Sequence, residues 1–596
     1  MSSSAPTTVA PLSARPIGTR EWRRFTAAAT RVAERTGWPL FWLVLVVVLL
    51  VPTACFLVLA VSPRLFDQGS AWFSTASFSR ALGGIAGQGM VDSIAVGVSA
   101  AVLATTAATA LAWVLQRTMI AGRRIWAVAV WAVLLMPSYL IAVGWQTVLD
   151  KGGVLSSLGF YSAGLRSLFF GPVGYTFILA LKGAPFAYFA VAAAMAGIGR
   201  SYEEAARVHG ASRRTRMTTT ASLIRPALFA ALIIVFAESI ADFGTAVVIA
   251  PNAHFPIATY TLYTALSSYP ADFGVAAVVG WMLVASVAVA LVIQRRLMAR
   301  RSYAVLGGRM RPAVPVRLDP LRRTLAFAGV CTFFLLALGI PVLGAVVSSL
   351  LEPFHHLGLH TLTVSAYRGI LSSTALGAPI DVSFKMALIT ACVTLVLASV
   401  VARRLAAGRL DAVSKVMDLT LMAAVALPGL VLAAGYIFAY NLPVVGTLGI
   451  HIYGTLWVLG MAYLAGALPS TSRILVGPMT QVQGSLLAAA RVHGASTATA
   501  WRKGVLPLLA PSLIWAWLLT FATTFLELPA SELLSPPGVK PISVAIVQVL
   551  NKSDLFRGTA LSVVALLVDL TMIVLVTVGF RVLAPKGWRK VGARVF

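Results

Sequence analysis

The chain has 596 residues, of which 59% are hydrophobic and only 11% charged, and its formal net charge is +28. Soluble domains usually contain roughly 45–50% apolar and 25% charged residues. The composition therefore excludes an ordinary soluble protein and indicates a membrane protein.

Apolar runs of 18 or more residues recur along the chain, each long enough to cross a hydrocarbon core about 30 Å thick. They predict an all-α polytopic membrane protein with twelve transmembrane helices. The expected spans are 39–61, 91–116, 125–149, 172–199, 224–250, 273–294, 324–350, 383–402, 415–440, 451–475, 508–530 and 559–582. The first run is too long and too far from Met1 for a cleaved signal peptide, so residues 1–38 are expected to form a cytoplasmic tail.

The basic residues follow the predicted topology. With a cytoplasmic N-terminus, most Lys and Arg fall in residues 1–38, in alternate loops and in residues 583–596. This is the positive-inside distribution, and it places both termini in the cytoplasm. Nucleic-acid binding needs a basic surface that follows phosphates, whereas these charges adjoin apolar helices. Membrane lipid is therefore an expected partner and nucleic acid is not.

An internal repeat divides the chain into two parts. The octamer AARVHGAS occurs at residues 205–212 and again at 489–496, and Pro185 matches Pro469 at the same separation. The basic segment 295–323 separates the repeats, which predicts a first six-helix unit over 39–294 and a second over 324–582, followed by a cytoplasmic tail at 583–596. Because six spans separate the two octamers, both lie on the cytoplasmic side, and the repeats are parallel.

The repeated loop has the features of a short helix with a sharp exit. Ser201 and Glu204 can form a capping box at its start, and Gly210 can end it with a positive φ. The sequence therefore predicts a short helix, a glycine turn and a second helix on the cytoplasmic face of each half, near residues 202–209 and 486–493.

These loops resemble the cytoplasmic loop of permease subunits of binding-protein-dependent ATP-binding-cassette (ABC) importers, which reads EAA, three residues and G, followed later by LP. The matching residues are Glu203, Glu204, Ala205, Ala206 and Gly210 in the first copy, and Ala488, Ala489, Ala490, Gly494 and Pro507 in the second. The resemblance implies coupling helices that contact two copies of a cytoplasmic ABC ATPase. Ala488 replaces Glu204 and Leu223 stands where the second half has Pro507, so the two couplings need not be equal. Glu204 alternatively serves only as a helix cap.

The remaining parts of such an importer are expected on other chains. A Walker A loop needs Gly-Lys, a dipeptide that is absent here, so ATP is expected to be used by the partner subunit and no cofactor by this chain. The outer loops are too short for a receptor domain, which implies a separate periplasmic or extracellular solute-binding protein. The resemblance also implies a bacterial inner membrane, and no enzyme activity is expected.

The segments ADFGT and ELPA with a following PPG resemble those of fused, two-halved permeases of the iron(III) branch. Similar fused permeases serve aminoethylphosphonate, thiamine and polyamine importers, which stay as alternatives. Glu238, Asp242 and Glu527 are carboxylates near the ends of apolar helices, and Asp242 and Glu527 occupy equivalent repeat positions. Two interpretations are open: the acids line the translocation path and favour a cation, or they cap neighbouring backbone. Lys182, whose counterpart is Gly466, either contacts substrate or reaches a polar cavity.

No metal site is expected. His355, His356 and His360 have a spacing that could hold a metal, but a solvated outer loop is the preferred interpretation, and the three cysteines lie in apolar spans without CxxC spacing. The expected mechanism is alternating access driven by the separate ATPase. The rivals are a secondary transporter, which has few membrane-embedded charges for a proton relay here, and a membrane enzyme or scaffold, for which HExxH and GxSxG motifs are absent.

Overall fold

The computed structural model describes residues 38–198, 208–253, 255–299, 315–351, 361–408, 412–425, 427–449, 451–482, 484–552 and 554–583. Within these ranges the regular structure is helical, apart from two isolated β-bridges, Thr118 with Val316 and Leu351 with Leu362. The helices of residues 38–299 are α2 (Trp38–Leu59), η2 (Pro63–Phe66), α3 (Ala76–Leu82), α4 (Ile85–Arg117), α5 (Arg123–Leu135), α6 (Ser138–Leu149), α7 (Val154–Ser157), α8 (Ala163–Phe169), α9 (Pro172–Gly197), α11 (Arg213–Ala241), α12 (Gly244–Ile249), η3 (Ala250–Asn252), α13 (Ala258–Ser267) and α14 (Phe273–Ala299).

The second half repeats this order. Its helices are α15 (Pro320–Phe334), the π-helix η4 (Leu335–Gly339), α16 (Ile340–Leu350), α17 (Ser365–Ser372), α18 (Thr374–Ala406), α19 (Ala412–Val425), α20 (Gly429–Tyr440), α21 (Pro443–Thr447), α22 (Leu456–Thr480), α23 (Gly484–Val492), α24 (Thr497–Ala500), the π-helix η5 (Trp501–Val505), α25 (Leu506–Phe525), α26 (Pro529–Leu534), α27 (Ile542–Asn551) and α28 (Leu555–Leu583). α14 ends at Ala299 and α15 begins at Pro320, so both enter the segment predicted as a linker.

The described residues confirm an all-α polytopic membrane protein, while the count of twelve crossings stays a prediction. Nine helical segments are long and apolar enough to span a membrane. Two further spans are broken: α5 and the helices that follow it meet at 97°, and α19 and α20 form the second bent pair. α22 fills the tenth predicted span with 25 residues but is not one of the nine.

The two halves pack their helices in the same way. α4, α9 and α11 pack together in the first half, as α18, α22 and α25 do in the second. α13 packs on α14, and α27 packs on α28. α12 contacts α6, and α26 contacts α20. The repeat seen in the sequence is therefore also a repeat of tertiary structure.

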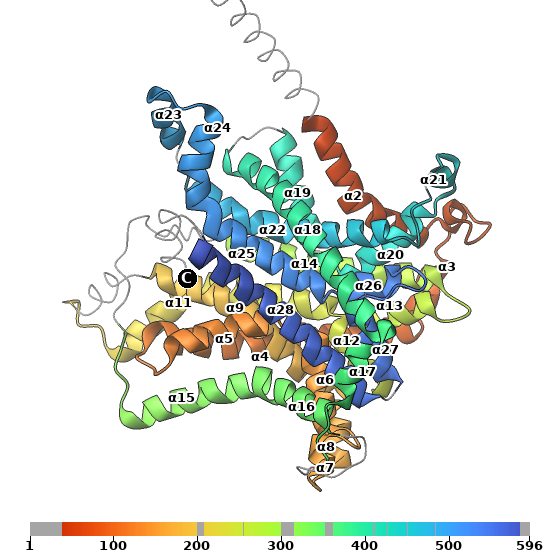
Figure 1. Ribbon diagram of the computed structural model, residues 1–596, viewed down its shortest axis with the longest axis horizontal. Coiled ribbons are helices and arrows are strands. Elements are labelled where there is room, and N and C mark those ends of the chain that lie inside the picture. Colours follow the sequence, from red (N-terminus) through yellow and green to blue (C-terminus); the bar gives the residue numbers. More distant parts are fainter. Residues whose placement is uncertain are drawn as a thin grey trace, which may run out of the picture.

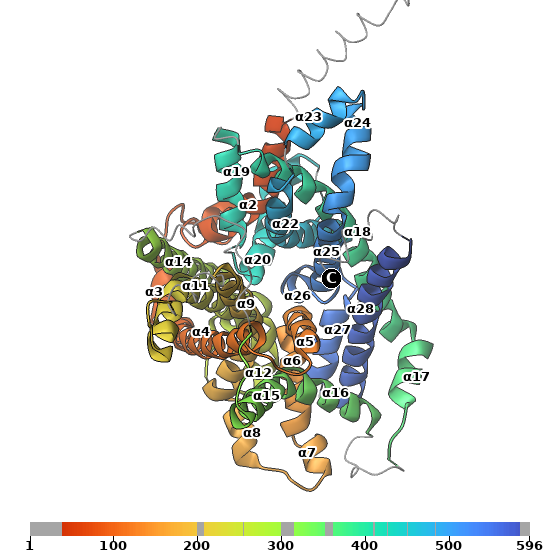
Figure 2. The same ribbon diagram turned by 90° about the vertical axis from the view of Figure 1, so that its left-hand side faces the viewer.

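The first helix of each half packs against the broken span of the other half. α2 lies along α20, and α16 lies along α6, as Figures 1 and 2 both show. The two halves therefore interlock, since each first helix packs against the other half as well as against the last helix of its own half.

Glycines allow this exchange because helices can approach most closely where a side chain is missing. A Cβ on Gly144 would lie 2.4 Å from the carbonyl oxygen of Pro341, and a Cβ on Gly435 would lie 2.4 Å from that of Pro52. The neighbours are backbone atoms, which cannot move aside as a side chain can. The two contacts are equivalent, so each half presents a proline to the glycine of the other.

An aromatic donor completes each contact. Pro52 has no N–H to donate to the carbonyl of Val48, and the Tyr436 hydroxyl donates to this oxygen at 2.9 Å. In the π-helix η4 the bonds run five residues back, so Pro341 leaves the carbonyl of Leu336 without a backbone donor. Trp145 Nε1 donates to that oxygen at 3.1 Å. Aromatic donors from the opposite half thus replace the backbone donors that the prolines remove.

Candidate functional site

The carboxylate of Asp242 lies where the long helix α11 stops. Its Oδ2 accepts the backbone N–H of Thr245 at 2.7 Å, and its Oδ1 accepts the Ser138 hydroxyl at 2.5 Å. Its main-chain carbonyl accepts the hydroxyl of Thr259 at 2.9 Å. Asp242 therefore caps α12 and ties it to α6 and α13.

Glu527 does the same between α25 and α26. Its Oε1 accepts the N–H of Ala530 at 2.8 Å, and its Oε2 accepts the N–H and the hydroxyl of Ser531 at 3.0 Å and 2.9 Å. The hydroxyl of Ser543 donates to its main-chain carbonyl. Both acids thus cap backbone as the second interpretation expected, and contact of either acid with a cargo stays a prediction.

Lys182 stabilises the broken span of the first half. Its Nζ donates to the carbonyls of Leu134 at 2.7 Å and Met136 at 2.8 Å, where α5 ends. Lys182 is therefore held by two main-chain carbonyls. Glu238 lies one turn before Asp242 on α11, with its side chain exposed. The first half has this one cation and the two acids Glu238 and Asp242 near its broken span.

Glu532 is a site candidate that sequence reasoning missed. Its Oε1 accepts the hydroxyl of Tyr263 at 3.0 Å, a bond between the two halves. Its Oε2 is buried and has no partner among the described residues. Glu532 lies in the same apolar stretch as Glu527, and this position was the available signal. Only Glu527 aligned with an acid of the first half, so Glu532 was passed over.

A polar cavity of about 490 Å³ lies between the halves near the far end of α12. Gln146, Asp150, Arg166 and Tyr260 line it from the first half, and Asn551 and Phe556, among others, from the second. Two charged residues that line the cavity form an ion pair with each other, since Arg166 Nε lies 2.7 Å from Asp150 Oδ1. On the predicted topology, this cavity faces the outer side.

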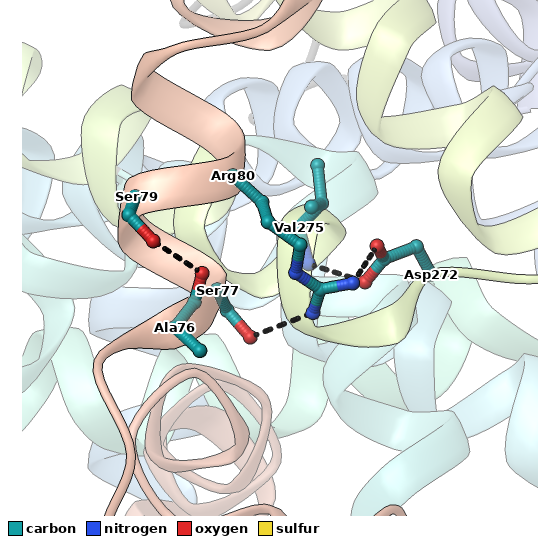
Figure 3. Close-up of polar contacts among 6 residues, drawn as sticks. All are labelled: Ala76, Ser77, Ser79, Arg80, Asp272 and Val275. Atoms are coloured by element: carbon teal, nitrogen blue, oxygen red, sulfur yellow. Dashed lines mark hydrogen bonds and ion pairs between the residues drawn. The ribbon is translucent and has the colours of Figure 1, made fainter.

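An ion pair joins α3 to the start of α14 in the first half. Figure 3 shows Arg80 reaching from α3 to Asp272, at 2.6 Å, and to Ser77, at 3.3 Å. Asp272 also caps α14 by accepting the N–H of Val275 at 3.0 Å. Gly274 permits this approach, because a Cβ there would lie 2.3 Å from the Ser77 hydroxyl oxygen.

The equivalent place in the second half is built differently. Asp554 caps α28 as Asp272 caps α14, by accepting the N–H of Arg557 at 3.0 Å. Phe556 stands where the first half has Gly274, and Arg368 of α17 where it has Arg80. Within the described residues Asp554 pairs with Arg557, at 3.7 Å, and not with Arg368. The second half thus has the phenyl ring of Phe556 where the first half has Gly274, and it lacks the counterpart of the ion pair between Arg80 and Asp272 among the described residues.

The second predicted coupling loop is a helix with a glycine exit. Ala488, Ala489 and Ala490 lie on α23, which projects from the body with α24 at the top of Figures 1 and 2. Gly494 has φ +78° and follows α23. The Ser496 hydroxyl then accepts the N–H of Thr499 at 3.2 Å, and Pro507 lies at the start of α25.

The described part of the first coupling loop matches the second. Glu203, Glu204, Ala205 and Ala206 lie outside the described residues, as do His355, His356 and His360. Gly210 has φ +67°, and the Ser212 hydroxyl accepts the N–H of Thr215 at 3.2 Å. Val208 and its counterpart Val492 are each 84% exposed. These two apolar side chains were missed, although both lie inside the repeated octamer.

An arginine anchors the root of the first loop. Arg117, at the end of α4, is 4% exposed, and its Nη2 donates to the carbonyls of Met195 at 2.9 Å and Ile198 at 3.0 Å. Met195 lies in the last turn of α9, and Ile198 directly follows this helix. In the second half, Arg403 instead lies over the ring of Trp501, 4.5 Å from its centroid.

No group of three or more His, Cys, Asp and Glu side chains suited to a metal ion occurs within the described ranges. The three cysteines are free thiols.

Comparison with known proteins supports one relationship, although no family model matches the chain. The ferric transport system permease protein FbpB of Actinobacillus pleuropneumoniae is 24% identical over 480 residues, which cover 78% of this chain and 67% of that protein. The probable ABC transporter permease protein y4fN of Sinorhizobium fredii is 24% identical over 445 residues, 73% of this chain and 77% of that protein. The Fe(3+)-transport system permease protein FbpB 2 of Haemophilus influenzae is 22% identical over 523 residues, 85% and 92% of the two chains. The relationship predicted by the repeated loop is thus confirmed: over most of its length, this chain is a homologue of the permease proteins of ABC transporters.

Proposed function

We propose that this chain is the membrane permease subunit of an ATP-driven importer and forms its translocation path. The observation that carries this proposal is the repeated cytoplasmic loop. Each copy has a glycine at positive φ, an exposed valine and a serine-capped helix, and it continues into a helix that ends at a capping acid. Homology to ABC permease proteins over most of the chain supports the same conclusion.

The proposed cargo is iron(III). Several relatives that align over most of this chain carry names that specify ferric transport. Aminoethylphosphonate, thiamine and polyamine are less supported, because none of these relatives is named for them.

The proposed partners are two copies of a cytoplasmic ABC ATPase and a separate solute-binding protein on the outer side. Two matched loops on one face suit a motor with two equivalent grooves. Val208 and Val492 would enter those grooves as the apolar contacts, with the loop alanines beside them. The distribution of basic residues supports cytoplasmic loops and termini in a bacterial inner membrane.

The helices after the loops form the lever. α11 runs unbroken from Arg213 to Ala241, and Ala498–Phe525 is one helical run. Movement of a loop would therefore be carried along the helix to Asp242 or Glu527, where the acid ties it to the next short helix. Closure of the ATPases would tilt both levers and open the path alternately outward and inward. This chain would bind no cofactor, and ATP would be used by the partner.

The test is uptake of radioactive iron(III) into vesicles that contain the chain, its ATPase and its receptor. Gly210→Val and Gly494→Val should each lower uptake at least tenfold while ATP hydrolysis continues, because valine resists positive φ. Gly449→Val is the matched control: Gly449 has φ +71° but lies in an outer loop, and a Cβ would meet nothing within 4 Å. Its uptake should stay within twofold of the unchanged chain. Uptake without any ATPase, or full uptake by both loop variants, would refute the proposal.

A further inference from the structure

A large apolar groove opens on the first half, away from the capping acids. It has a volume of about 1070 Å³ and lies between α4, α9, α11 and α14. Trp113, Ile224, Leu228, Phe229 and Leu232 form much of its wall. It adjoins the ends of α9 and α11 that lead into the first coupling loop. The groove is therefore placed where the lever leaves the membrane.

One cation lines this groove. Arg225 is exposed, and its guanidinium group makes no hydrogen bond or ion pair with any described residue. It lies on α11 seven residues after Thr218, where the apolar stretch Thr218–Ala241 begins. That distance is about 10 Å along the helix, within the range over which an arginine side chain can reach the membrane interface. An anionic group at that interface would pair with the guanidinium group of Arg225.

The second half lacks this arrangement at the equivalent place. Pro511 matches Pro226, so Ala510 stands where the first half has Arg225. Trp517 stands where it has Leu232, stacks on Phe521 at 5.5 Å and donates to the Cys392 sulfur at 3.4 Å. The second half thus has no cation at this position, and an indole ring stands where the first half has a leucine in the wall of the groove. The equivalent region of the second half therefore serves as the reference that lacks both the arginine and the leucine of the groove.

We propose that this groove binds an anionic phospholipid of the leaflet next to the coupling loops. One acyl chain lies against the apolar wall, and the phosphate is held by Arg225. A phospholipid suits the site because the groove is lined mainly by apolar side chains of helices long enough to span a membrane, and because its phosphate supplies a negative charge for Arg225. The assignment to the cytoplasmic leaflet rests on the proposed function, whereas the binding itself does not.

The experiment measures lipid bound to the purified full-length chain. The chain in mild detergent is mixed with equal amounts of phosphatidylglycerol and phosphatidylethanolamine, and bound lipid is counted by native mass spectrometry. One basic residue near a phosphate contributes about 1 kcal/mol, or roughly a fivefold preference. We expect phosphatidylglycerol to be retained about fivefold over phosphatidylethanolamine. Arg225→Gln should abolish this preference.

Two further variants separate charge from shape. Leu232→Trp copies the second half and should lower retention of both lipids, with the guanidinium still present. Arg296→Gln removes a cation of α14 that does not line the groove, and should leave the preference unchanged. If Arg225→Gln does not fold, Leu232→Trp decides alone.

Three results would overturn the inference. Equal binding of both lipids by the unchanged chain would mean that only the non-specific lipid around the protein is retained. A preference for phosphatidylglycerol that persists in Arg225→Gln, or undiminished lipid retention in Leu232→Trp, would also contradict it. No ATPase or receptor is present in this measurement. A wrong permease assignment would therefore leave the lipid result intact, and loss of the lipid result would leave the uptake test standing.

Discussion

The first half of the chain fastens its broken span with Lys182, whereas the second half has Gly466 at the equivalent position, in open space. The same difference recurs at the start of the last helix of each half, where Arg80 pairs with Asp272 but Asp554 pairs with Arg557 and not, among the described residues, with Arg368. By contrast, the glycine–proline contacts between the halves occur in both copies, and in each a Cβ added to the glycine would lie 2.4 Å from the proline carbonyl oxygen.

This contrast separates contacts that both halves need from contacts that only one has. A close backbone approach tolerates no added atom, so a matched pair of such contacts requires glycine in both halves. A hydrogen bond or ion pair contributes less and can be replaced by a different packing arrangement. The expected sizes of the following effects therefore decrease from the glycine contacts to the exposed ion pair.

The largest effect is expected from Gly144→Ala and Gly435→Ala. Each added Cβ would meet backbone of the opposite half, so each variant should lose more than about 3 kcal/mol of unfolding free energy, beyond ordinary overpacking. The two losses should agree within about 1 kcal/mol. Gly466→Ala is the control, since its Cβ would meet nothing within 4 Å. Thermal unfolding in detergent measures all three, and a large difference between the first two would break the equivalence of the contacts.

Arg117→Met should have the next largest effect, confined to the root of the first coupling loop. It removes two buried charge-assisted bonds to the end of α9, each contributing about 1.5–3 kcal/mol. Hydrogen–deuterium exchange should rise in residues 208–220. Residues 493–505 serve as the internal control and should not change. Equal increases in both loops would show that Arg117 does not act locally.

Lys182→Met should cost about 1–2 kcal/mol. Two carbonyls at the end of α5 would lose their donor, and this loss would be partly offset because a buried charge disappears. Lys385→Met, which breaks an exposed pair with Asp381, should stay within about 0.5 kcal/mol in the same unfolding measurement. An unchanged or raised stability of Lys182→Met would mean that the broken span does not depend on this lysine.

The smallest effect is expected from Arg80→Ala. Its pair with Asp272 is largely exposed and should contribute less than about 1 kcal/mol, decreasing as salt is added. Arg368→Ala should have no measurable effect at any salt concentration. If the two variants behaved alike, the ion pair in Figure 3 would not distinguish the halves.

Hydrophobic runs and the internal repeat predicted where the helices lie in the sequence and which helix of one half is equivalent to which helix of the other. Each predicted span contains a helix, and the match of Gly144 with Gly435 marks two equivalent contacts. Periodicity could not predict where spans break, because Pro137 and Pro428 stand inside runs that are apolar on both sides. Nor could it predict the exchange of α2 and α16, because homology identifies equivalent helices without saying which half each one contacts.

The candidate site was predicted in position more than in chemistry. The alignment of Asp242 with Glu527 correctly marked two equivalent places. Capping of backbone was one of the two interpretations open from the sequence, and the turn of the backbone at these points is what shows the caps. The bond between Tyr263 and Glu532 joins residues 269 positions apart and has no counterpart in the other half, so the repeat gave no signal for it.

Because the first helix of each half packs on the other half, the two members of each contact are synthesised at different times. Val48 and the tyrosine that binds its carbonyl are 388 residues apart, whereas the equivalent tryptophan contact spans 191. At roughly 5–20 residues per second, α2 must wait about 20–80 seconds in the membrane before its partner is made. In the second contact Trp145 is made first, and the carbonyl of Leu336 that it binds follows after about half that time. During this interval, an unpaired carbonyl beside Pro52 must be satisfied by lipid headgroups, water or the insertion machinery, which makes the earliest helix the most exposed to misassembly.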